Sequence, residues 1–345
     1  MIRVAVAGAS GYSGGELLRI LALHPGVELV RLAAGEQAGR RLAEAHPQFR
    51  GTELGERVLC ASDWNELGEG ADVAFLALPH GHALTAAPRL LAQGCRVIDI
   101  GADFRLRDPE QYRRWYGLEH SAAELLAEAV YGLPELQRAR LAEARLVANP
   151  GCYPTAAALA LLPLLPHAAE EPIVVDAKSG VSGAGRKATL EYAFSEVDES
   201  LRPYGVLSHR HTPEIAQTLA IAGAARPVVF TPHLIPMVRG LLATCYVRLA
   251  EPPADLELLY AERYRGEPFV TVLGSDELPA TGSLRGANRC EVAVRFDEES
   301  GLAIAFGAID NLVKGAAGQA VQNMNLMFGL DERIGLTAAP AAVPA

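Results

Sequence analysis

The sequence lacks an excess of positive charge. Its 345 residues include 31 Lys and Arg against 41 Asp and Glu, a formal net charge of −10. A protein that neutralises nucleic-acid phosphates needs clustered Lys and Arg that dominate one surface. The charge balance therefore excludes a broad nucleic-acid-binding face, although it is compatible with a local basic pocket.

The sequence also lacks an apolar leader or spanning segment at its start. The opening MIRVAVAGASGYSGGELL is strand-like, but glycines interrupt it from Gly8 onward. This segment is too short and too broken for a signal peptide or a membrane span. We therefore expect a cytoplasmic protein with no membrane partner.

Cysteine is scarce and irregularly spaced. The five cysteines form no C-x-x-C pair and have no nearby histidine pair, so the sequence predicts neither a disulfide framework nor a metal site. Buried free cysteines usually pack as small apolar residues, and only Cys152 has a neighbourhood that suggests otherwise. The five are Cys60, Cys95, Cys152, Cys245 and Cys290.

What the sequence does have is enough apolar residues, 50%, for a large core and for two domains. Up to residue 150, strand-like and helix-like segments alternate, which predicts a parallel sheet. After residue 150, longer strands joined by turns predict a mixed or antiparallel sheet, and a final helical stretch is expected to return to the first domain. We therefore predict an α/β protein with a discontinuous first domain of residues 1–150 and 313–345, strands near 27–34, 71–79 and 95–101, a helix near 81–94, and a second domain of residues 151–312.

The first turn of the chain carries three regularly spaced glycines. Gly8, Gly11 and Gly14 lie between a strand and a helix, where glycines let the backbone approach a pyrophosphate and the helix N-terminus attracts its charge. Glycine-rich turns also occur for packing alone, but this context favours dinucleotide binding. The predicted cofactor site consists of Gly8, Ser10, Gly11, Tyr12, Ser13 and Gly14.

The end of the second predicted strand distinguishes the two nicotinamide cofactors. An NAD site usually has an acidic residue there, whereas an NADP site needs room and positive charge. Here Glu36 lies beyond Gly35, and Arg40 and Arg41 follow closely. This order favours NADP; the alternative is that the two arginines are solvated residues at the start of a helix.

Cys152 lies in ANPGCYPTA, at the start of an Ala- and Leu-rich helix. A helix N-terminus stabilises a thiolate, and its unpaired N–H groups can form an oxyanion hole. Pro150 and Gly151 would set a tight approach, and Thr155 could close the first turn. Cys152 is therefore a candidate nucleophile; a structural cysteine is the alternative.

A nucleophilic thiol needs an acid or base partner, which can lie far away in sequence. PYGVLSHRHTPEI supplies His209 and His211 just before a helix that contains Glu214. Because Glu214 could orient an imidazole at the helix start, we favour His211 as the acid/base and His209 as a substrate contact. The reverse assignment remains open.

Two further segments could hold an anion. DAKSGVSGAGRKA follows a buried strand, and its glycines, serines and cations suit an anion-binding loop; a flexible linker is the alternative. Arg105 in DIGADFRL has a guanidinium that suits phosphate or carboxylate, or else forms a salt bridge with Asp99 or Asp103. The expected substrate or phosphate group is Arg105, Asn149, Lys178, Ser179, Gly180, Ser182 and His209.

A dinucleotide, a cysteine nucleophile and anion-binding groups together suggest reduction of an activated acyl group. In this scheme a thiolate displaces phosphate, and hydride reduces the resulting thioester to an aldehyde. The chain resembles the N-acetyl-γ-glutamyl-phosphate reductase family, relatives of aspartate-semialdehyde dehydrogenase, through seven segments in order: GASGYSGGEL, DIGADFRL, VYGLPEL, ANPGCYPTA, DAKSGVSGAGR, PYGVLSHRHTPEI and FTPHLIPMVRGLLAT.

The resemblance implies an enzyme of arginine biosynthesis with a Rossmann-type NADP-binding domain and an α+β catalytic domain with a mixed sheet. It implies a homodimer or homotetramer formed largely through the catalytic domain. It also implies that Cys152 forms the thioacyl intermediate and that His211 is the acid/base. Arg105 and the loop from Ser179 to Gly185 would contribute to the substrate site.

One branch of the same family reduces an aminoadipate 6-phosphate attached to a small acidic carrier protein in lysine biosynthesis. That substrate is one methylene longer, and a pocket discriminates one methylene by only about 1–3 kcal/mol. A carrier would need a basic surface, for which the candidates are Arg40, Arg41, Lys187, Arg113 and Arg114. We favour the free glutamyl substrate and keep the carrier-linked one as the alternative.

Two other classes of function stay open at this point. A non-catalytic NADP-binding regulatory protein would bind the dinucleotide without needing a reactive thiol. A Cys/His hydrolase would use the thiol without needing a dinucleotide, so the glycine turn argues against it.

Overall fold

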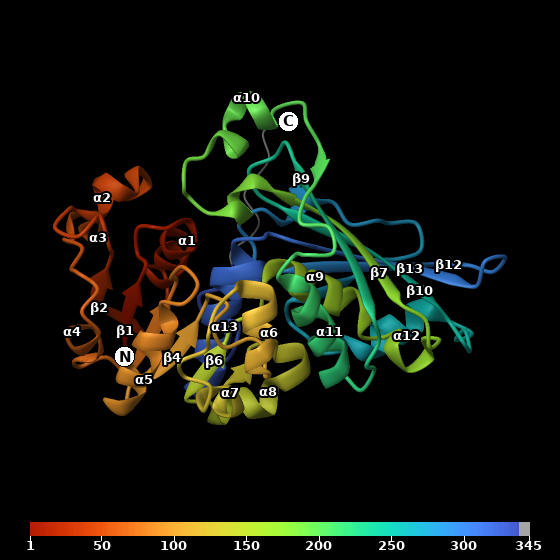
Figure 1. The fold of residues 1–345 in the computed structure, drawn as a ribbon, viewed down its shortest axis with the longest axis horizontal. Helices are drawn as coiled ribbons and strands as arrows, with labels where there is room; N and C mark the ends of the chain where they lie inside the picture. Colours follow the sequence, from red (N-terminus) through yellow and green to blue (C-terminus); the bar gives the residue numbers. More distant parts are fainter. Residues whose placement is uncertain (338–345) are drawn as a thin grey trace. The chain divides into compact units, whose positions relative to one another are not determined.

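The structure is a computed structural model that describes residues 1–337 of the chain. The described residues divide into two compact units, one formed by Met1–Pro150 with Ala316–Thr337 and the other by Gly151–Gly315 (Figure 1). The sequence-based division placed the return to the first domain at residue 313, three residues before the observed Ala316. It also assigned residues 338–345 to that domain, and these lie outside the described residues.

The first unit is built on a six-stranded sheet in the order β2-β1-β3-β4-β6-β5, and all of its pairings are parallel. Its strands are β1 Ile2–Ala7, β2 Val27–Ala33, β3 Val73–Leu76, β4 Arg96–Asp99, β5 Val130–Tyr131 and β6 Leu146–Ala148. Its helices are α1 Tyr12–Leu21, α2 Leu42–Ala45, α3 Glu53–Glu56, α4 Trp64–Gly68, α5 Ala83–Ala92, α6 Pro109–Tyr116, α7 Leu125–Glu128, α8 Pro134–Glu143 and α13 Gly318–Met327.

Helices cover both faces of this sheet, which explains why its short strands read as apolar runs. One face forms a core with α4, α5, α6 and α7, to which β1 contributes Ala5 and Ala7. The alternate residues Val4 and Val6 are also fully buried, so the opposite face is covered as well. There α13 packs against α1, α8 and β4.

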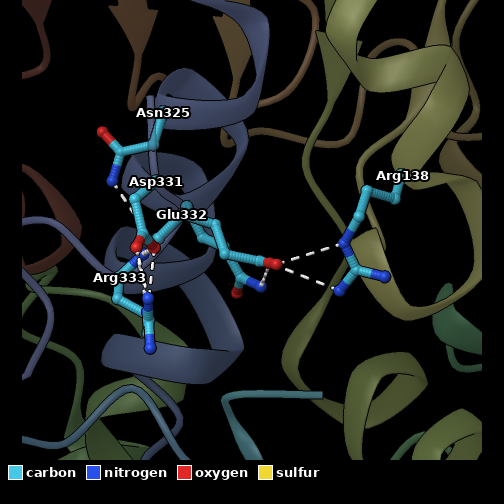
Figure 2. A network of polar contacts seen from close by, with 6 residues as sticks. Arg138, Asn325, Asp331, Glu332 and Arg333 are labelled. Atoms are coloured by element: carbon cyan, nitrogen blue, oxygen red, sulfur yellow. Dashed lines mark hydrogen bonds and ion pairs between the residues drawn. The ribbon is translucent and has the colours of Figure 1, made fainter. Parts of the chain in front are cut away.

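The described end of the chain is fastened to the first unit by polar contacts (Figure 2). Glu332 accepts hydrogen bonds from Arg138 of α8 at 3.1 and 3.4 Å, and from Gln322 of α13 at 2.8 Å. Asn325 donates to the carbonyl oxygens of Glu332 and Ile334 at 3.2 and 2.9 Å. These contacts hold the segment after α13 against α8.

The second unit contains a seven-stranded mixed sheet in the order β11-β12-β13-β10-β7-β9-β8. Its strands are β7 Ile173–Gly180, β8 Arg202–Pro203, β9 Val228–Ile235, β10 Leu241–Arg248, β11 Val270–Val272, β12 Cys290–Asp297 and β13 Leu302–Ile309. Its helices are α9 Cys152–Leu161, α10 Phe194–Val197, α11 His211–Ile221 and α12 Leu256–Arg263, followed by a π-helical turn at Val313–Ala317.

The helices α9, α11 and α12 pack on one face of the mixed sheet. The strand residues that alternate with the buried ones therefore lie on the opposite, open face. One row across this face joins four strands through the registered pairs of neighbouring residues, and Val174 and Val229 within it are 37% and 38% exposed. The row consists of Ile304, Tyr246, Val174 and Val229.

The predicted fold class is confirmed. The parallel sheet and the mixed sheet are both present, and residues 297–301 form the turn of the antiparallel hairpin of β12 and β13. The elements are shorter than expected at their ends, as with the strand expected at 71–79 and observed at Val73–Leu76. Within residues 1–337, no helix has the length and apolarity needed to cross a membrane.

Candidate active site

Cys152 is the first residue of α9. Gly151 precedes it as the N-cap in an extended conformation, with φ −70° and ψ 156° and no side-chain cap. Thr155 is fully buried, and both its N–H and its Oγ1 donate to the Gly151 carbonyl oxygen at 3.0 Å. The first turn of α9 is thus closed from within, as expected for Thr155, and Cys152 stays half-buried at the helix N-terminus.

Helix α9 is held firmly because it packs against the mixed sheet on β10, β13 and β12. A Cβ atom at Gly307 of β13 would lie 2.3 Å from the Ala156 carbonyl oxygen, so only glycine allows this close approach. At the other contact, a Cβ atom at Gly315 would lie 2.7 Å from the Cβ of Cys152. Cys152 therefore packs directly against Gly315 in the π-helical turn at Val313–Ala317.

Glu214 links the cysteine turn to α11. Its side chain is fully buried, and its Oε1 accepts a 2.8 Å hydrogen bond from the Gly151 N–H. Its Oε2 lies 3.9 Å from the Nε2 of His211, the first residue of α11. The carboxylate therefore lies between the start of α9 and an imidazole; the spacing of His211 and Glu214 predicted their proximity, whereas the bond to Gly151 was not predicted.

His209 is fixed by its main-chain neighbour. Its Nδ1 accepts a hydrogen bond of 3.0 Å from the His211 N–H, which places the proton of the neutral ring on Nε2. Burial, aided by the charge of Arg210, lowers the pKa of His209 to about 4. His209 is therefore neutral near pH 7 and presents an N–H donor.

Aromatic side chains enclose the two histidines. The ring of Tyr153 lies 5.7 Å from His209 and 5.8 Å from His211, and the ring of Tyr204 lies 5.4 Å from His209. The Tyr204 hydroxyl donates to the Tyr153 hydroxyl, which donates to the His233 carbonyl oxygen. Burial raises the pKa of both tyrosines, so both hydroxyls remain protonated donors.

Sequence reasoning missed an arginine held by a buried carboxylate. Asp310 is fully buried, and its two oxygens lie 3.1 Å from Nε and 3.3 Å from a terminal nitrogen of Arg239. The Asp310 carbonyl oxygen accepts the N–H of Gly315, the residue that packs on Cys152. The segment FTPHLIPMVRGLLAT contained the signal, but no local pattern links Arg239 to a carboxylate 71 residues away.

The loop after β7 differs from the expectation. The N–H groups of Gly180, Val181 and Ser182 donate to the carbonyl oxygens at residues 240, 237 and 238. These three N–H groups therefore already have acceptors in a neighbouring strand connection, and the anion-binding role of the loop stays a prediction that they do not support. The side chains of Ser179 and Ser182 are buried there, and Ser182 Oγ accepts from Asn311 at 2.9 Å.

Lys178 lies on the open face of the mixed sheet. Its Nζ forms an ion pair with Asp176 at 2.9 Å, and the same carboxylate oxygen lies 3.0 Å from Nδ1 of His233. The pleat directs alternate residues of β7 to opposite faces, so Lys178 points away from the helical layer that carries Cys152. This placement lends no support to Lys178 as a phosphate ligand.

In the first unit, the three glycines of the opening turn have separate roles. Gly8 has φ +81°, and a Cβ there would lie 2.1 Å from the Ala77 carbonyl oxygen. A Cβ at Gly14 would lie 2.2 Å from the Gly8 carbonyl oxygen, whereas one at Gly11 would meet no atom closer than 3.5 Å. Gly8 and Gly14 therefore allow tight packing, and Gly11 keeps the start of α1 open to a ligand, which is the pattern a pyrophosphate site needs.

The other residues expected at the cofactor site differ in their exposure and in their partners. Ser10 and Ser13 are half-buried beside the turn, and Tyr12 is 42% exposed. Arg41 is paired with Glu44 at 3.3 Å and Glu56 at 3.0 Å. The Arg40 side chain is exposed and has no hydrogen-bond or ion-pair partner within residues 1–337, so Arg40 is better placed than Arg41 to bind a phosphate.

Arg105 and Asn149 also lie in the first unit, and they bind each other. Arg105 donates from Nε to the Asn149 carbonyl oxygen at 2.8 Å and from a terminal nitrogen to the Ile100 carbonyl oxygen at 3.0 Å. The Asn149 side chain donates to the Ala316 carbonyl oxygen and accepts from Asn323. Both residues fasten the turn that follows β6, and these contacts add nothing to the expectation of a phosphate site.

Beside Arg105, two buried carboxyl groups share the end of β4. Burial, together with the charge of Asp103, raises the pKa of Asp99 to about 7, while the charge of Arg105 opposes the shift. The Asp103 carboxylate accepts from the N–H groups of Gly81 and Ala83 at 2.8 and 2.9 Å, at the start of α5. Among the described residues, no group of three or more His, Cys, Asp or Glu could hold a metal ion.

Comparison with known proteins decides the family. A family model described as "Semialdehyde dehydrogenase, NAD binding domain" matches residues 3–144, and one described as "Semialdehyde dehydrogenase, dimerisation domain" matches residues 152–311. An N-acetyl-gamma-glutamyl-phosphate reductase from Pelotomaculum thermopropionicum is 49% identical over 350 residues, 99% of both chains. One from Desulforudis audaxviator is 52% identical over 342 residues, covering 97% of this chain and 98% of the relative.

The chain belongs to the N-acetyl-gamma-glutamyl-phosphate reductase family.

Solved structures agree on the fold of this reductase family member. Aspartate semialdehyde dehydrogenase II from Vibrio cholerae has a TM-score of 0.74 at 19% identity, covering 95% of this chain and 99% of its own. The enzyme with NADP from Candida albicans has a TM-score of 0.72 at 15% identity, covering 97% and 99%. At such low identity the likeness shows the fold alone, and the predicted likeness to aspartate-semialdehyde dehydrogenase is confirmed.

Proposed function

We propose that this reductase converts N-acetyl-γ-glutamyl phosphate to N-acetylglutamate 5-semialdehyde with NADPH, a step of arginine biosynthesis. The observation that carries the proposal is the half-buried Cys152 at the uncapped start of α9, joined through Gly151 and Glu214 to the His211 turn. A structural cysteine would not need this arrangement. A regulatory NADP-binding protein would not need it either.

In the first half-reaction, the Cys152 thiolate attacks the acyl carbon of the substrate. The carbon–oxygen bond to phosphate breaks, phosphate leaves, and a thioester forms on the sulfur. The oxygen that becomes negative in this step needs donors. The first-turn N–H groups of Cys152 and Tyr153 suit this role, because helix geometry gives them no intrahelical acceptor and Gly151 already donates to Glu214.

In the second half-reaction, His211 supplies the proton that the reduced acyl oxygen needs and takes it back as the thiolate is released. When bound, the dinucleotide supplies the hydride. The Glu214 carboxylate, whose Oε2 lies 3.9 Å from the Nε2 of His211, is suited to orient the imidazole for this transfer. His209, neutral and with its proton on Nε2, is suited to donate a hydrogen bond to the substrate.

We further propose that Arg239 holds the phosphate group before it leaves. Asp310 holds the guanidinium of Arg239 in a fixed orientation. A guanidinium held in this way is suited to bind a phosphate through charged hydrogen bonds. The support is its position in the β9–β10 connection, whose neighbouring Asp310–Gly315 segment packs on Cys152. Arg105 remains a candidate from the sequence, but its Nε and one terminal nitrogen donate to carbonyl oxygens of the chain.

The first unit is suited to NADP. The turn of Gly8, Gly11 and Gly14 is suited to a pyrophosphate, because a Cβ at Gly11 would meet no atom closer than 3.5 Å. Arg40 is the expected partner of the 2′-phosphate, since Arg41 already pairs with two carboxylates. Ser10, Tyr12 and Ser13 complete the proposed cofactor site.

The substrate is proposed to be a free small molecule. The curated relatives carry the glutamyl name, so the aminoadipyl alternative is not favoured. Of the basic residues that an acidic carrier would need, Arg41 and Arg113 each pair with two carboxylates of their own surface. Those pairs lower the positive potential that would attract a carrier.

We also propose a cytoplasmic homo-oligomer that assembles through the open face of the mixed sheet. The half-exposed apolar row of Ile304, Tyr246, Val174 and Val229 is the kind of surface that a second copy would bury. The family model that covers this unit is described as a dimerisation domain. The molecular mass in solution distinguishes a dimer from a tetramer.

Phosphate-dependent reduction of NADP⁺ by N-acetylglutamate semialdehyde, the reverse reaction, tests the proposed function. We expect turnover that requires both phosphate and Cys152, and a much weaker response to carrier-linked aminoadipate semialdehyde at equal concentration. Preference for the carrier-linked aldehyde would overturn the substrate assignment. Conversion of N-acetyl-γ-glutamyl phosphate to the free acid without consumption of NADPH would instead indicate a hydrolase.

Arg239 has its own readout in the same assay. Arg239→Met should raise the KM for phosphate at least about tenfold, because a charged hydrogen-bonded contact contributes roughly 1.5–3 kcal/mol. Arg105→Met is the matched comparison. A larger effect on the phosphate KM at residue 105 would return the phosphate site to the residue that sequence reasoning chose.

A further inference from the structure

An arm of the second unit, residues 186–208, leaves the sheet between β7 and α11. It contains α10 and then β8, whose two residues pair with His233 and Leu234 of β9 at the sheet edge. Figure 1 shows α10 standing clear of the strands of this unit. The arm is therefore attached at its ends while its middle lies away from the core.

The arm is unusually apolar for an exposed segment. Leu190 is 77% exposed, Phe194 81% and Leu207 71%, and two further apolar side chains of the arm are exposed as well. Single exposed apolar residues are normal, but a group of them on one segment marks an interaction site. The exposed apolar residues of the arm are Leu190, Phe194, Leu201, Val206 and Leu207.

The backbone conformation of the arm also indicates an interaction site. Within residues 1–337, the only non-glycine residues with positive φ are Glu199 at 56° and Leu207 at 59°, and both lie in the arm. Leucine is strongly disfavoured in this region, and such conformations persist only where the surroundings impose them. Because Leu207 is largely exposed, the contacts that would impose its conformation are not supplied by the chain itself.

The base of the arm belongs to the candidate active site. Tyr204 lies three residues before Leu207, donates to the Tyr153 hydroxyl and packs on His209. The Tyr204 N–H also donates to the Pro232 carbonyl oxygen, which ties the base to β9. A contact that fixes residues 190–207 therefore also restrains the ring that encloses His209.

Charge decides which partner the arm fits. Residues 186–208 contain three basic and four acidic residues, a net charge of −1, so the arm has no excess of positive charge to attract an acidic carrier protein. A nearly neutral, apolar surface suits a second copy of the chain, and the family model described as a dimerisation domain covers the whole arm. The four acidic residues are Glu191, Glu196, Asp198 and Glu199, and the three basic residues are Arg186, Lys187 and Arg202.

We propose that the arm docks on a second copy of the chain through Leu190, Phe194 and Leu207, and that this docking fixes Tyr204 and His209 for catalysis. The inference rests on the proposed reductase function only for its catalytic readout. The self-association it requires is measured separately. A subunit that has lost this contact keeps its fold but loses turnover.

The test compares Leu190→Ser/Phe194→Ser with the wild type over a dilution series. Sedimentation velocity gives the subunit dissociation constant, and the reverse-reaction assay gives turnover per subunit at each concentration. If the complex is too tight to dissociate, subunit exchange between tagged and untagged protein gives the dissociation rate. Burying an exposed Leu or Phe side chain at an interface strengthens association about tenfold or more, so replacing both is expected to raise either quantity at least tenfold.

Turnover should follow association. The double variant is expected to lose turnover on dilution and to recover it at high protein concentration, with KM changing less than kcat. Leu23→Ser in the first unit is the matched control, because Leu23 is 73% exposed, like Leu190 at 77%, but lies outside the arm. The thermal unfolding of both variants should match the wild type, since the replaced side chains are exposed.

Other outcomes would overturn the proposal in distinguishable ways. An unchanged dissociation constant in the double variant, together with dissociation by Val174→Glu on the open sheet face, would leave the oligomer standing but remove the arm from its interface. A wild-type monomer with full turnover would remove the arm contact while leaving the reductase assignment intact. Selective binding of an acidic carrier by the arm would replace the second copy with a different partner.

Discussion

Helices α1 and α9 begin in the same manner in the two units of the molecule. Each has ten residues, a glycine N-cap in extended conformation, no side-chain cap and no acidic residue in its first turn. Both therefore present uncapped N–H groups and the positive end of a helix dipole. The two helix starts differ in the group that each one is suited to stabilise.

At α1 the chain leaves room for a ligand. Gly11 has φ −79° and ψ 171°, and no atom lies within 3.4 Å of where its Cβ would be. At α9 the chain places a thiol at the helix start, because Cys152 is the first helical residue, and Glu214 accepts the Gly151 N–H. One helix start suits an anion that arrives and leaves, and the other suits a sulfur that stays and reacts.

The comparison also shows how each helix start is kept in place. Around α1, backbone-to-backbone contact does this, since Gly8 and Gly14 touch carbonyl oxygens. Around α9, buried side chains do it, since Thr155 and Glu214 are both fully buried and both bond Gly151. Substitutions should therefore act on ligand binding at the first site and on chemistry at the second.

The largest effect is expected at Cys152. Cys152→Ser should lower turnover by roughly four orders of magnitude or more, because a hydroxyl in this place is a far weaker nucleophile. NADPH binding to the first unit, followed by fluorescence titration, should persist. Cys60→Ser, at another half-buried cysteine, is the control and should leave turnover intact. Retained activity in Cys152→Ser would end the nucleophile assignment.

His211→Asn should slow the reaction by roughly 10²–10⁴-fold, the usual effect of losing a general acid or base. It should also remove a limb from the pH profile of kcat. His209→Asn should act mainly on substrate KM, because its ring is neutral and its Nδ1 is already bonded to the His211 N–H. A lost pH limb in His209→Asn but not in His211→Asn would reverse the two roles.

His209 should also make the fold sensitive to acid. Its folded pKa of about 4 lies below its ordinary 6.5, so between these values the unfolded chain binds a proton that the folded chain does not. The free energy of unfolding should therefore fall as pH drops from 6.5 to 4, by about 3 kcal/mol from this group, and be unaffected by it above 6.5.

Urea unfolding of wild type and His209→Asn at pH 7 and pH 4.5 isolates this contribution. Other groups that titrate in the range, including Asp99 with its raised pKa, cancel in the difference between the two proteins. The variant should lose less stability on acidification than the wild type. Parallel losses would mean that His209 is protonated in the folded state as easily as in the unfolded chain.

Gly14→Ala and Gly11→Ala should separate packing from binding at α1. A Cβ at residue 14 would lie 2.2 Å from the Gly8 carbonyl oxygen, so we expect about 1–3 kcal/mol less unfolding free energy despite alanine's better helix propensity. Gly11→Ala meets only an ordinary contact and should leave stability within about 1 kcal/mol. Its expected effect is at least tenfold weaker NADPH binding, measured by titration beside thermal unfolding.

The sequence was a good guide to both helix starts because each is set by adjacent residues. The spacing of Gly8, Gly11 and Gly14 predicted a strand-turn-helix, and Gly151–Cys152 predicted a helix start, without any distant contact. His211 and Glu214 belong to one helical turn, so their approach was predictable too. Local geometry settles these features before tertiary packing does.

Distant pairings were beyond sequence reasoning. Asp310 meets Arg239 across 71 residues, and the Gly180 to Ser182 donors are used by a connection between other strands. The direction of Lys178 depends on which face of the sheet the helices cover, and β7 alternates in the same way whichever face is chosen. Each of these depends on strand order, which no local pattern contains.

The smallest effect, and the finest test of the comparison, concerns the cofactor's second phosphate. Arg40→Ala should weaken NADPH binding about tenfold while leaving NADH unchanged, because the exposed guanidinium is expected to meet the 2′-phosphate. Arg41→Ala is the matched control: it removes exposed ion pairs with Glu44 and Glu56, which contribute about 0–1 kcal/mol to stability, and should hardly affect either cofactor. Equal loss of NADPH and NADH in Arg40→Ala would mean that α1 and its glycines bind the dinucleotide without reading that phosphate. In that case the turn at Gly11 would bind the pyrophosphate, and residues other than Arg40 and Arg41 would determine the choice between NADP and NAD.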